Sequence, residues 1–195
     1  MFILLMNIGL IKMEDYMEIH INRQEKTVKW DYNGKTVNVH NEYMLYAFKH
    51  GKDMLMIKER YETAGSGFSL YDITGEKIFS YKYLDRDISY KGNRIIQVQG
   101  NIISVDYQQE KGKLIVLKEE NEIRTIVLYE EKGNFIAEIN APRGYKLVSL
   151  KNNEGNIMAV AQGMNDITRD SFGRNDWNFE INLENYYVEK KSIIQ

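Results

Sequence analysis

The stretch Leu70-Tyr71-Asp72-Ile73-Thr74-Gly75-Glu76-Lys77-Ile78 has the plan of a β-hairpin, in which two apolar runs flank a short polar turn. Its glycine can adopt the positive φ angles that such a tight turn needs. Comparable turns recur along the chain, at Asn33-Gly34, at Gly112, at Gly133 and at Asn185, where asparagine takes the place of glycine. Because one hairpin alone is only marginally stable, we expect these hairpins to join larger sheets.

Polar and apolar residues alternate through much of the remaining sequence. The alternation is strict in Asn178-Phe-Glu-Ile-Asn-Leu183 and looser in residues 77–83. A period of two is typical of strands with one face on a core, and no segment has a long helical stripe; residues 41–49 and 166–172 are weak helix candidates. The chain of 195 residues, 43% of them hydrophobic, has the size of one domain. We predict a single all-β domain of antiparallel meanders over residues 1–195.

Two longer stretches share the order strand, turn, strand, long loop, strand, turn, strand. They cover residues 46–75 and 147–183, and each has the plan of a four-stranded propeller blade. The glycines at Gly34, Gly75 and Gly112 recur about every 40 residues, the length of one blade. On these hairpins and this spacing, the sequence resembles β-propeller proteins. The resemblance implies about four blade-like sheets, and the alternative that we keep open is an irregular β-sandwich.

The small number of blades bears on assembly. A stack of about four sheets can close on itself or stay open, and an open stack exposes one face at each end. We expect such faces to be apolar and therefore prone to pairing. The sequence thus predicts either a homodimer or a tight four-bladed monomer.

The residue counts exclude several kinds of chemistry. Lys and Arg number 26 and Asp and Glu number 28, so the net charge of −2 lacks the basic surplus of a nucleic-acid binder. The chain has no cysteine, and its histidines, His20, His40 and His50, do not have the spacing of metal ligands. The sequence contains no phosphate-binding loop and no nucleophile elbow. We therefore predict no nucleic-acid partner, no metal, no cofactor and no catalytic residue.

The N-terminal stretch Met1–Ile11 is the most apolar part of the chain. It is too short to cross a bilayer, which takes about 20 residues, and it lacks the basic start of a signal peptide. We interpret residues 1–16 as an edge strand, or as an extension upstream of a true start at Met13 or Met17. The expected protein is cytoplasmic and has no membrane partner.

Two polar loops are the candidate binding regions, because loops held on rigid sheets often carry binding sites. They are residues 58–67 and 162–177, each between the second and third strands of a blade-like unit. The second loop mixes arginine with aromatic residues, a composition enriched in binding hot spots. The candidate contact residues are Arg60, Tyr61, Glu62, Arg169, Asp170, Arg174, Asp176 and Trp177.

The preferred hypothesis is a non-enzymatic interaction or scaffold protein, whose loops contact a protein partner or another copy of the chain. It rests on the all-β repeat pattern, together with the lack of a histidine, cysteine or phosphate-loop constellation. The alternative is a protein that binds or hydrolyses a carbohydrate or another small polar ligand through loop acids and aromatics. Glycoside hydrolysis needs two carboxyl groups about 5–10 Å apart, and the candidate acids are Glu59, Glu62, Asp72, Asp170 and Asp176.

Overall fold

The computed structural model describes residues 18–51, 53–62, 65–92, 94–153 and 155–194. These residues form 17 strands in four antiparallel sheets, together with two short 3-10 turns, so the predicted all-β class is confirmed. In this part of the chain, no helix has the length and apolar character needed to cross a membrane. The interpretation of residues 1–16, and the choice between the starts Met13 and Met17, lie outside the described residues.

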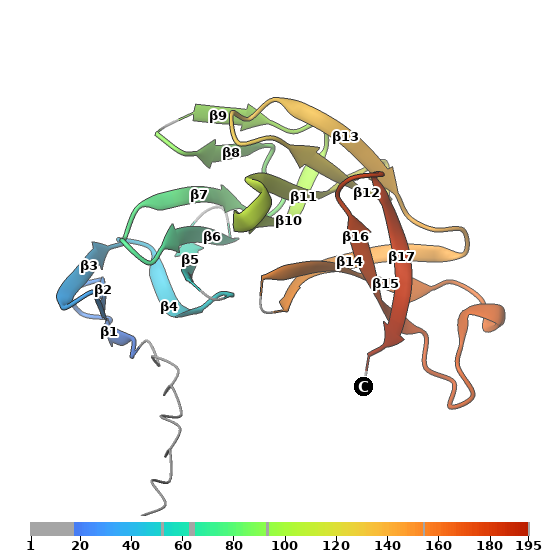
Figure 1. Cartoon of the computed structure of the whole chain (residues 1–195), viewed down its shortest axis with the longest axis horizontal. Coiled ribbons are helices and arrows are strands. Elements are labelled where there is room, and N and C mark those ends of the chain that lie inside the picture. Colours follow the sequence, from blue (N-terminus) through green and yellow to red (C-terminus); the bar gives the residue numbers. More distant parts are fainter. Residues whose placement is uncertain (1–17, 52, 63–64, 93, 154, 195) are drawn as a thin grey trace, which may run out of the picture.

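The sheets follow one another along the chain, and each is an up-and-down meander (Figure 1). Sheet 1 contains β1 (His20–Asn22), β2 (Thr27–Tyr32) and β3 (Lys35–His40). Sheet 2 contains β4 (Met44–Lys49), β5 (Met54–Tyr61), β6 (Gly65–Asp72), β7 (Lys77–Lys82), β8 (Asp87–Tyr90) and β9 (Arg94–Gln97). Sheet 3 contains β10 (Asn101–Gln108), β11 (Lys113–Glu120), β12 (Ile123–Tyr129) and β13 (Phe135–Asn140). Sheet 4 contains β14 (Tyr145–Asn153), β15 (Asn156–Gly163), β16 (Asp176–Asn182) and β17 (Tyr187–Ile193).

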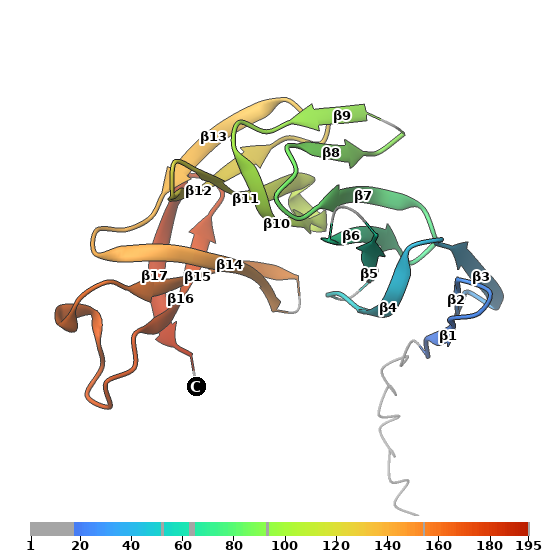
Figure 2. The same cartoon turned by 180° about the vertical axis from the view of Figure 1, so that it is seen from behind.

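The four sheets stack in series as an open arc, with sheet 1 at one end and sheet 4 at the other (Figures 1 and 2). A buried apolar cluster fills each interface between neighbouring sheets. Trp30 of sheet 1 is buried against sheet 2, and its indole N–H donates to the carbonyl of Ile73 at 2.8 Å. Each sheet therefore hides its apolar surface on the next one, as the marginal stability of isolated hairpins requires.

The strands in the middle of the stack serve two clusters at once. On β5, Leu55 and Ile57 pack toward sheet 1, while Met54 and Met56 pack toward sheet 3. Successive side chains of a strand point to opposite faces, so a sheet that is covered on both sides needs a continuous apolar run. This explains why β5 and β11 do not alternate in sequence, whereas β16 at the end of the stack does.

The hairpin between β6 and β7 has the geometry expected from its sequence. Asp72 Oδ1 accepts the N–H groups of Thr74 and Glu76, each at 2.9 Å. Gly75 has a φ of 90°, and a side chain at that position would meet Val37 of sheet 1 at 2.7 Å. Glycine is therefore needed here both for the backbone angle and for the close approach of sheet 1.

Two other turns differ in how well they follow their predictions. Asn33 and Gly34 both have positive φ, of 50° and 72°, as a type I′ turn requires. In the turn between β16 and β17, the residue with positive φ is Tyr186, at 57°, rather than Asn185.

Neither of the two weak helix candidates is an α-helix. Residues 41–49 are mainly β4, which pairs with β5. Within residues 166–172, only residues 166–168 form a short 3-10 turn.

The outer face of sheet 1 is polar, and that of sheet 4 is mixed. On sheet 1, the exposed Asp31 lies opposite Thr36. On sheet 4, Lys191 Nζ lies 2.9 Å from Glu180, but Met158 and Val160 lie on the same face, opposite Glu180 and Asn178. The expected apolar end faces are therefore not found on sheet 1 and are found only in part on sheet 4. The homodimer stays a prediction.

Candidate functional site

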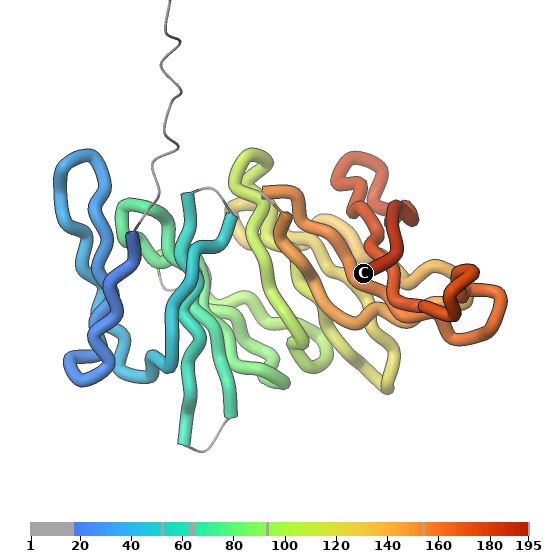
Figure 3. Tube along the Cα trace, turned by 90° about the horizontal axis from the view of Figure 1, so that it is seen from below, coloured from blue at the N-terminus to red at the C-terminus, as the bar shows by residue number. Residues whose placement is uncertain are grey.

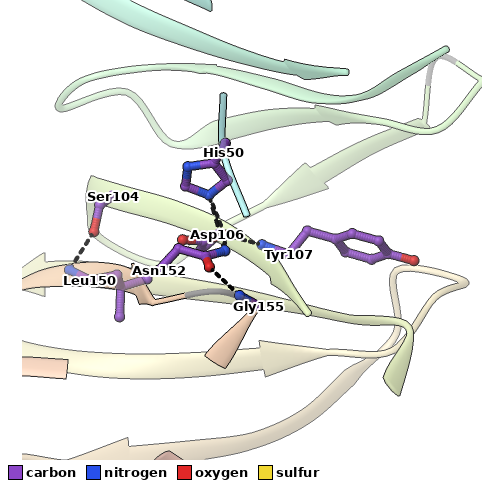
Figure 4. A network of polar contacts seen from close by, with 7 residues as sticks. All are labelled: His50, Ser104, Asp106, Tyr107, Leu150, Asn152 and Gly155. Carbon is purple, nitrogen blue, oxygen red and sulfur yellow. Dashed lines mark hydrogen bonds and ion pairs between the residues drawn. The ribbon is translucent and has the colours of Figure 1, made fainter. Parts of the chain in front are cut away.

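The first strands of sheets 2, 3 and 4 approach one another on the inner side of the arc. There, His50, which follows β4, meets Asp106 of β10 and Asn152 of β14 (Figure 4). His50 Nε2 lies 2.9 Å from Asp106 Oδ1, and Asn152 Nδ2 lies 3.4 Å from the same oxygen. The side chains of His50 and Asp106 are 13% and 4% exposed. One carboxylate thus joins three sheets that are far apart in sequence.

The hydrogen bonds within this cluster assign its protons. An ionised carboxylate only accepts, so His50 Nε2 carries the hydrogen that it shares with Asp106. Asp106 Oδ1 also accepts the N–H of Tyr107 at 2.7 Å, and Asn152 Oδ1 accepts the N–H of Gly155 at 2.9 Å. The 3.3 Å contact between Asn152 Nδ2 and His50 Nε2 joins two donors, so it is not a hydrogen bond. In the neutral imidazole, the second nitrogen, Nδ1, is then an acceptor.

A His–Asp pair can act as a general base when its free nitrogen reaches a substrate. The structure forms a polar pocket of about 480 Å³, but this pocket lies at the other end of β10, around Asn101. Its lining residues are Arg86, Gln99, Gly100, Asn101, Glu119, Glu120 and Asn121. Within the described residues, no group of three or more His, Asp or Glu side chains could hold a metal ion. We therefore interpret the His50 cluster as a clasp between sheets.

The loop between β15 and β16, residues 164–175, is held in shape by Asp170. The carboxylate of Asp170 accepts the N–H groups of Phe172 and Arg174 at 2.9 and 2.8 Å. It also lies 2.7 Å from the guanidinium of Arg174. Burial alone would raise the pKa of Asp170, but the hydrogen bonds from Arg174 and from the N–H of Phe172 outweigh it and hold that pKa below its ordinary value. Asp170 and Arg174 therefore pair with each other within the loop, and their predicted contact with a ligand or partner stays a prediction.

The start of the same loop is anchored to sheet 4. Thr168 is buried, and its carbonyl accepts the indole N–H of Trp177 at 2.8 Å. Thr168 lies so close to Gly163 that a Cβ at position 163 would overlap its hydroxyl. On the other side, the ammonium of Lys190 lies 3.3 Å from the centre of the Trp177 ring. Trp177 is therefore a half-buried residue of β16 whose indole binds the loop through Thr168.

Three large apolar side chains project from this anchored loop into solvent. Ile167 is 93% exposed, Phe172 is 81% exposed and Met164 is 66% exposed. The guanidinium of Arg174 lies 5.3 Å from the centre of the Phe172 ring, which fixes one aromatic face beside a cation. Exposed apolar groups on a preorganised loop, with charged groups around them, have the composition of an interaction surface.

The other predicted residues of the second loop are Arg169, within the loop, and Asp176, at its end. Arg169 is exposed and lies 3.4 Å from the carboxylate of Asp166. Asp176 is the exposed first residue of β16 and pairs in register with Gln162. The loop therefore brings Arg169, Asp170 and Arg174 into one segment, with Asp176 and Trp177 at its base.

The first predicted loop, residues 58–67, is largely strand. β5 continues to Tyr61, β6 begins at Gly65, and Tyr61 pairs directly with Gly65. The connection is shorter than predicted because both flanking segments pair along their whole length. Arg60 and Glu62 are exposed at its end, whereas the Tyr61 hydroxyl turns back to donate to Glu59 at 2.5 Å.

The two predicted regions do not form one site. The connection between β5 and β6 lies on sheet 2, the loop between β15 and β16 lies on sheet 4, and sheet 3 stands between them (Figures 1 and 3). Three of the five candidate acids bind other groups of the chain. Glu59 is buried and accepts three side-chain hydrogen bonds, while Asp72 and Asp170 cap their own turns. The other two, Glu62 and Asp176, are exposed on sheets 2 and 4, and a carboxylate pair for hydrolysis stays a prediction.

Sequence reasoning missed the residues that project furthest and those that cluster at the centre. Ile167 and Phe172 lie in a polar loop, and the binding prediction named the arginines and acids around them rather than these two residues. His50, Asp106 and Asn152 each lie at or near the end of the first strand of a sheet. A comparison of that position across the predicted sheets would have found them, because equivalent ends of stacked meanders meet.

No family model matches this chain, and no curated protein is similar to it. Among solved structures, the chain is similar to the crystal structure of a functionally unknown protein from Desulfotomaculum acetoxidans DSM 771, with 10% sequence identity and a TM-score of 0.37. The similarity covers 90% of this chain and 50% of that one, so this chain spans about half the length of that protein. A likeness at this level carries no conclusion about function.

Proposed function

We propose that this chain is a non-enzymatic interaction protein with a propeller-like stack of sheets, and that residues 164–175 contact a partner protein. The observation that carries the proposal is the exposure of Ile167 and Phe172, 93% and 81%, on a loop held by Asp170 and Arg174. The predicted residues Arg169, Asp170 and Arg174 act in it as the polar rim and internal support of the contact.

The energetics of association favour such a loop. Full burial of one large apolar side chain contributes about 1.5–3 kcal/mol, so Ile167 and Phe172 together can supply much of a contact's free energy. Because the loop is already held by its own hydrogen bonds, little conformational entropy is lost when a partner binds. Arg169 and Asp166 at its margin can provide orientation through charge, with little effect on affinity.

The test uses single substitutions in the loop and a matched control elsewhere. Ile167→Asp and Phe172→Asp remove the apolar contacts, while Ile123→Asp changes a side chain that is 66% exposed on sheet 3. The tagged full chain and its variants are used to recover partners from lysate of the source cells, after thermal unfolding has shown that all are folded. We expect a partner bound by the parent and by Ile123→Asp to be lost from both loop variants. Retention by both loop variants contradicts the proposal.

Self-association through the same loop is a distinct outcome of this test. Sedimentation equilibrium of the purified parent measures it directly, without lysate. A dimer that Ile167→Asp dissociates and Ile123→Asp preserves makes a second copy of the chain the partner. A dimer that both variants preserve uses another surface and has no bearing on the loop.

A further inference from the structure

Strand β4 is an edge strand, and no other described strand pairs with its free side. It begins the order β4-β5-β6-β7-β8-β9 of sheet 2 and pairs only with β5 among the described strands. The first strand of sheet 3 differs, because β10 packs against β14 and β15. Just beyond the end of β4, His50 contacts Asp106 of β10, and Gly51 lies beside Asn152 of β14. Residues 45–49 thus present unpaired backbone groups along their open side.

The side chains on this edge are unusually apolar for an open strand. Leu45 is 36% exposed, and Tyr46 and Phe48 are each 38% exposed. The rings of Tyr46 and Phe48 lie 5.9 Å apart, and the Lys58 ammonium lies 5.6 Å from the Tyr46 ring. Proteins usually protect open edges with charges or cover them, because an apolar edge is a template for another strand.

Other edges of the stack are protected in these ways. β17 carries Glu189, Lys190 and Lys191, and β3 carries the exposed residues Lys35, Asn38 and His40. β9 has only four residues, and short edge strands resist pairing. β4 differs from these edges in carrying three partly exposed large apolar side chains, Leu45, Tyr46 and Phe48, beside a side that no described strand pairs with.

The charges beside this edge specify its occupant. The charged residues on β4 and β5 are Lys49, Lys58, Arg60 and Glu59. Glu59 is buried with its carboxylate bound to other side chains, so the charge that β4 and β5 present to solvent is entirely basic. We propose that the free edge of β4 binds an extended acidic segment of a partner protein, which adds to sheet 2 as a further strand.

Strand addition assigns a role to each part of the edge. Main-chain hydrogen bonds to residues 45–49 supply affinity, and apolar side chains at alternate positions of the peptide rest on Tyr46 and Phe48. Acidic side chains between them point to the opposite face of the sheet, where Lys49 lies beside Ala47. This surface lies on sheet 2, away from the loop at residues 164–175, so either interaction can fail without the other.

The backbone directions allow a substitution that blocks addition and spares sheet 2. The N–H of His50 donates to Met54 of β5, and alternate residues of a strand point to opposite sides. The N–H groups of Phe48 and Tyr46 therefore face β5, and that of Ala47 faces the free side. Ala47→Pro removes an outward donor and leaves the pairing with β5 in place, because proline is tolerated on edge strands.

The experiment titrates the full chain with a synthetic peptide of about six residues that alternates valine and glutamate, and follows amide chemical shifts by NMR. We expect the largest shifts at β4, binding about fivefold weaker for the same peptide with lysine in place of glutamate, and loss of binding to Ala47→Pro. Lys49→Glu should weaken binding as the lysine peptide does, while the matched Lys35→Glu on β3 should leave it unchanged. Each variant is first shown to be folded by its thermal unfolding.

Four results of the peptide titration overturn the proposal. They are the absence of shifts at β4 at millimolar peptide, equal binding of the glutamate and lysine peptides, unchanged binding to Ala47→Pro, and binding that appears only after removal of residues 1–16. The last would make that segment the natural occupant of the edge. A concentration-dependent dimer that Ala47→Pro dissociates would assign the edge to a second copy of the chain, and would also overturn it.

Discussion

Glu59 lies on β5 with 3% of its surface exposed, and its carboxylate is held by three side-chain donors. Oε1 accepts from Asn41 Nδ2 at 2.6 Å and from Ser69 Oγ at 2.5 Å, and Oε2 accepts from the Tyr61 hydroxyl at 2.5 Å. Asn41 lies in the connection between sheets 1 and 2, where its N–H donates to the carbonyl of Lys26. The carboxylate therefore ties that connection to the middle of sheet 2.

The cost of Glu59→Ala follows from the donors that it leaves behind. Asn41 is 7% exposed and Ser69 is fully buried, so neither can find water without disturbing the fold. Each buried donor left unsatisfied costs about 1–3 kcal/mol, which gives about 2–6 kcal/mol in total. Domains of this kind are stable by about 5–15 kcal/mol, so this loss would be a large part of the whole. Glu59→Gln keeps Oε1 as an acceptor and should cost clearly less.

The assay is urea unfolding of the parent, Glu59→Ala, Glu59→Gln and the exposed control Glu62→Ala. We expect the control to lie within about 0.5 kcal/mol of the parent. A second readout is the phenol of Tyr61, whose pKa is raised by burial and then by the hydrogen bond to Glu59 and its charge. Glu59→Gln should lower that pKa in a spectroscopic titration. A Glu59→Ala variant as stable as the control would refute the reasoning.

Three further predictions concern the backbone, the aromatic core and the clasp. Gly100 has a φ of 102°, and a side chain there would meet the β11 backbone at 2.7 Å, whereas a side chain at Gly92 would meet open space. Gly100→Ala should therefore lower the free energy of unfolding in urea by about 1–3 kcal/mol more than Gly92→Ala does. Equal losses for the two variants would contradict this. Burial raises the pKa of Tyr81, so the folded state holds that proton more tightly, and stability is full below about pH 10 and falls as the pH rises further. Tyr81→Phe should flatten this alkaline loss in unfolding measured at about pH 8 and about pH 11; an unchanged slope would argue against it. Asp106→Ala should lower the free energy of unfolding by about 1–3 kcal/mol for each buried donor that it leaves without an acceptor. It should also speed solvent exchange of the His50 ring N–H, which NMR can follow. An unaltered exchange rate would exclude the assigned tautomer.

The fold class could be predicted because its signal is local. The turn at Gly75 and the strict alternation of residues 178–183 depend only on neighbouring residues, and both have the predicted structure. The sizes of the sheets could not be predicted in the same way. Sheet 2 has six strands because β8 pairs with β7 and β9 pairs with β8, instead of the two forming a separate sheet. That choice is made by packing between sheets, which a local pattern does not contain.

The candidate site was predictable only where it coincides with a long connection. The loop before Asp176 is marked by its length and polarity, while residues 58–67 have a similar composition and form strands. Composition could not separate the two, because the pairing of Tyr61 with Gly65 decides the outcome. The exposure of Ile167 is likewise set by how Thr168 and Trp177 anchor the loop, and no local rule distinguishes it from a buried isoleucine.

The role of the loop can be measured most directly by photo-cross-linking in the source cells. A photoreactive phenylalanine derivative replaces Phe172 in one version of the full chain and Phe135, which is 61% exposed on sheet 3, in another. We expect one discrete cross-linked protein from position 172 and none from position 135. Irradiation that yields no adduct at position 172, or the same adducts at both positions, would contradict it.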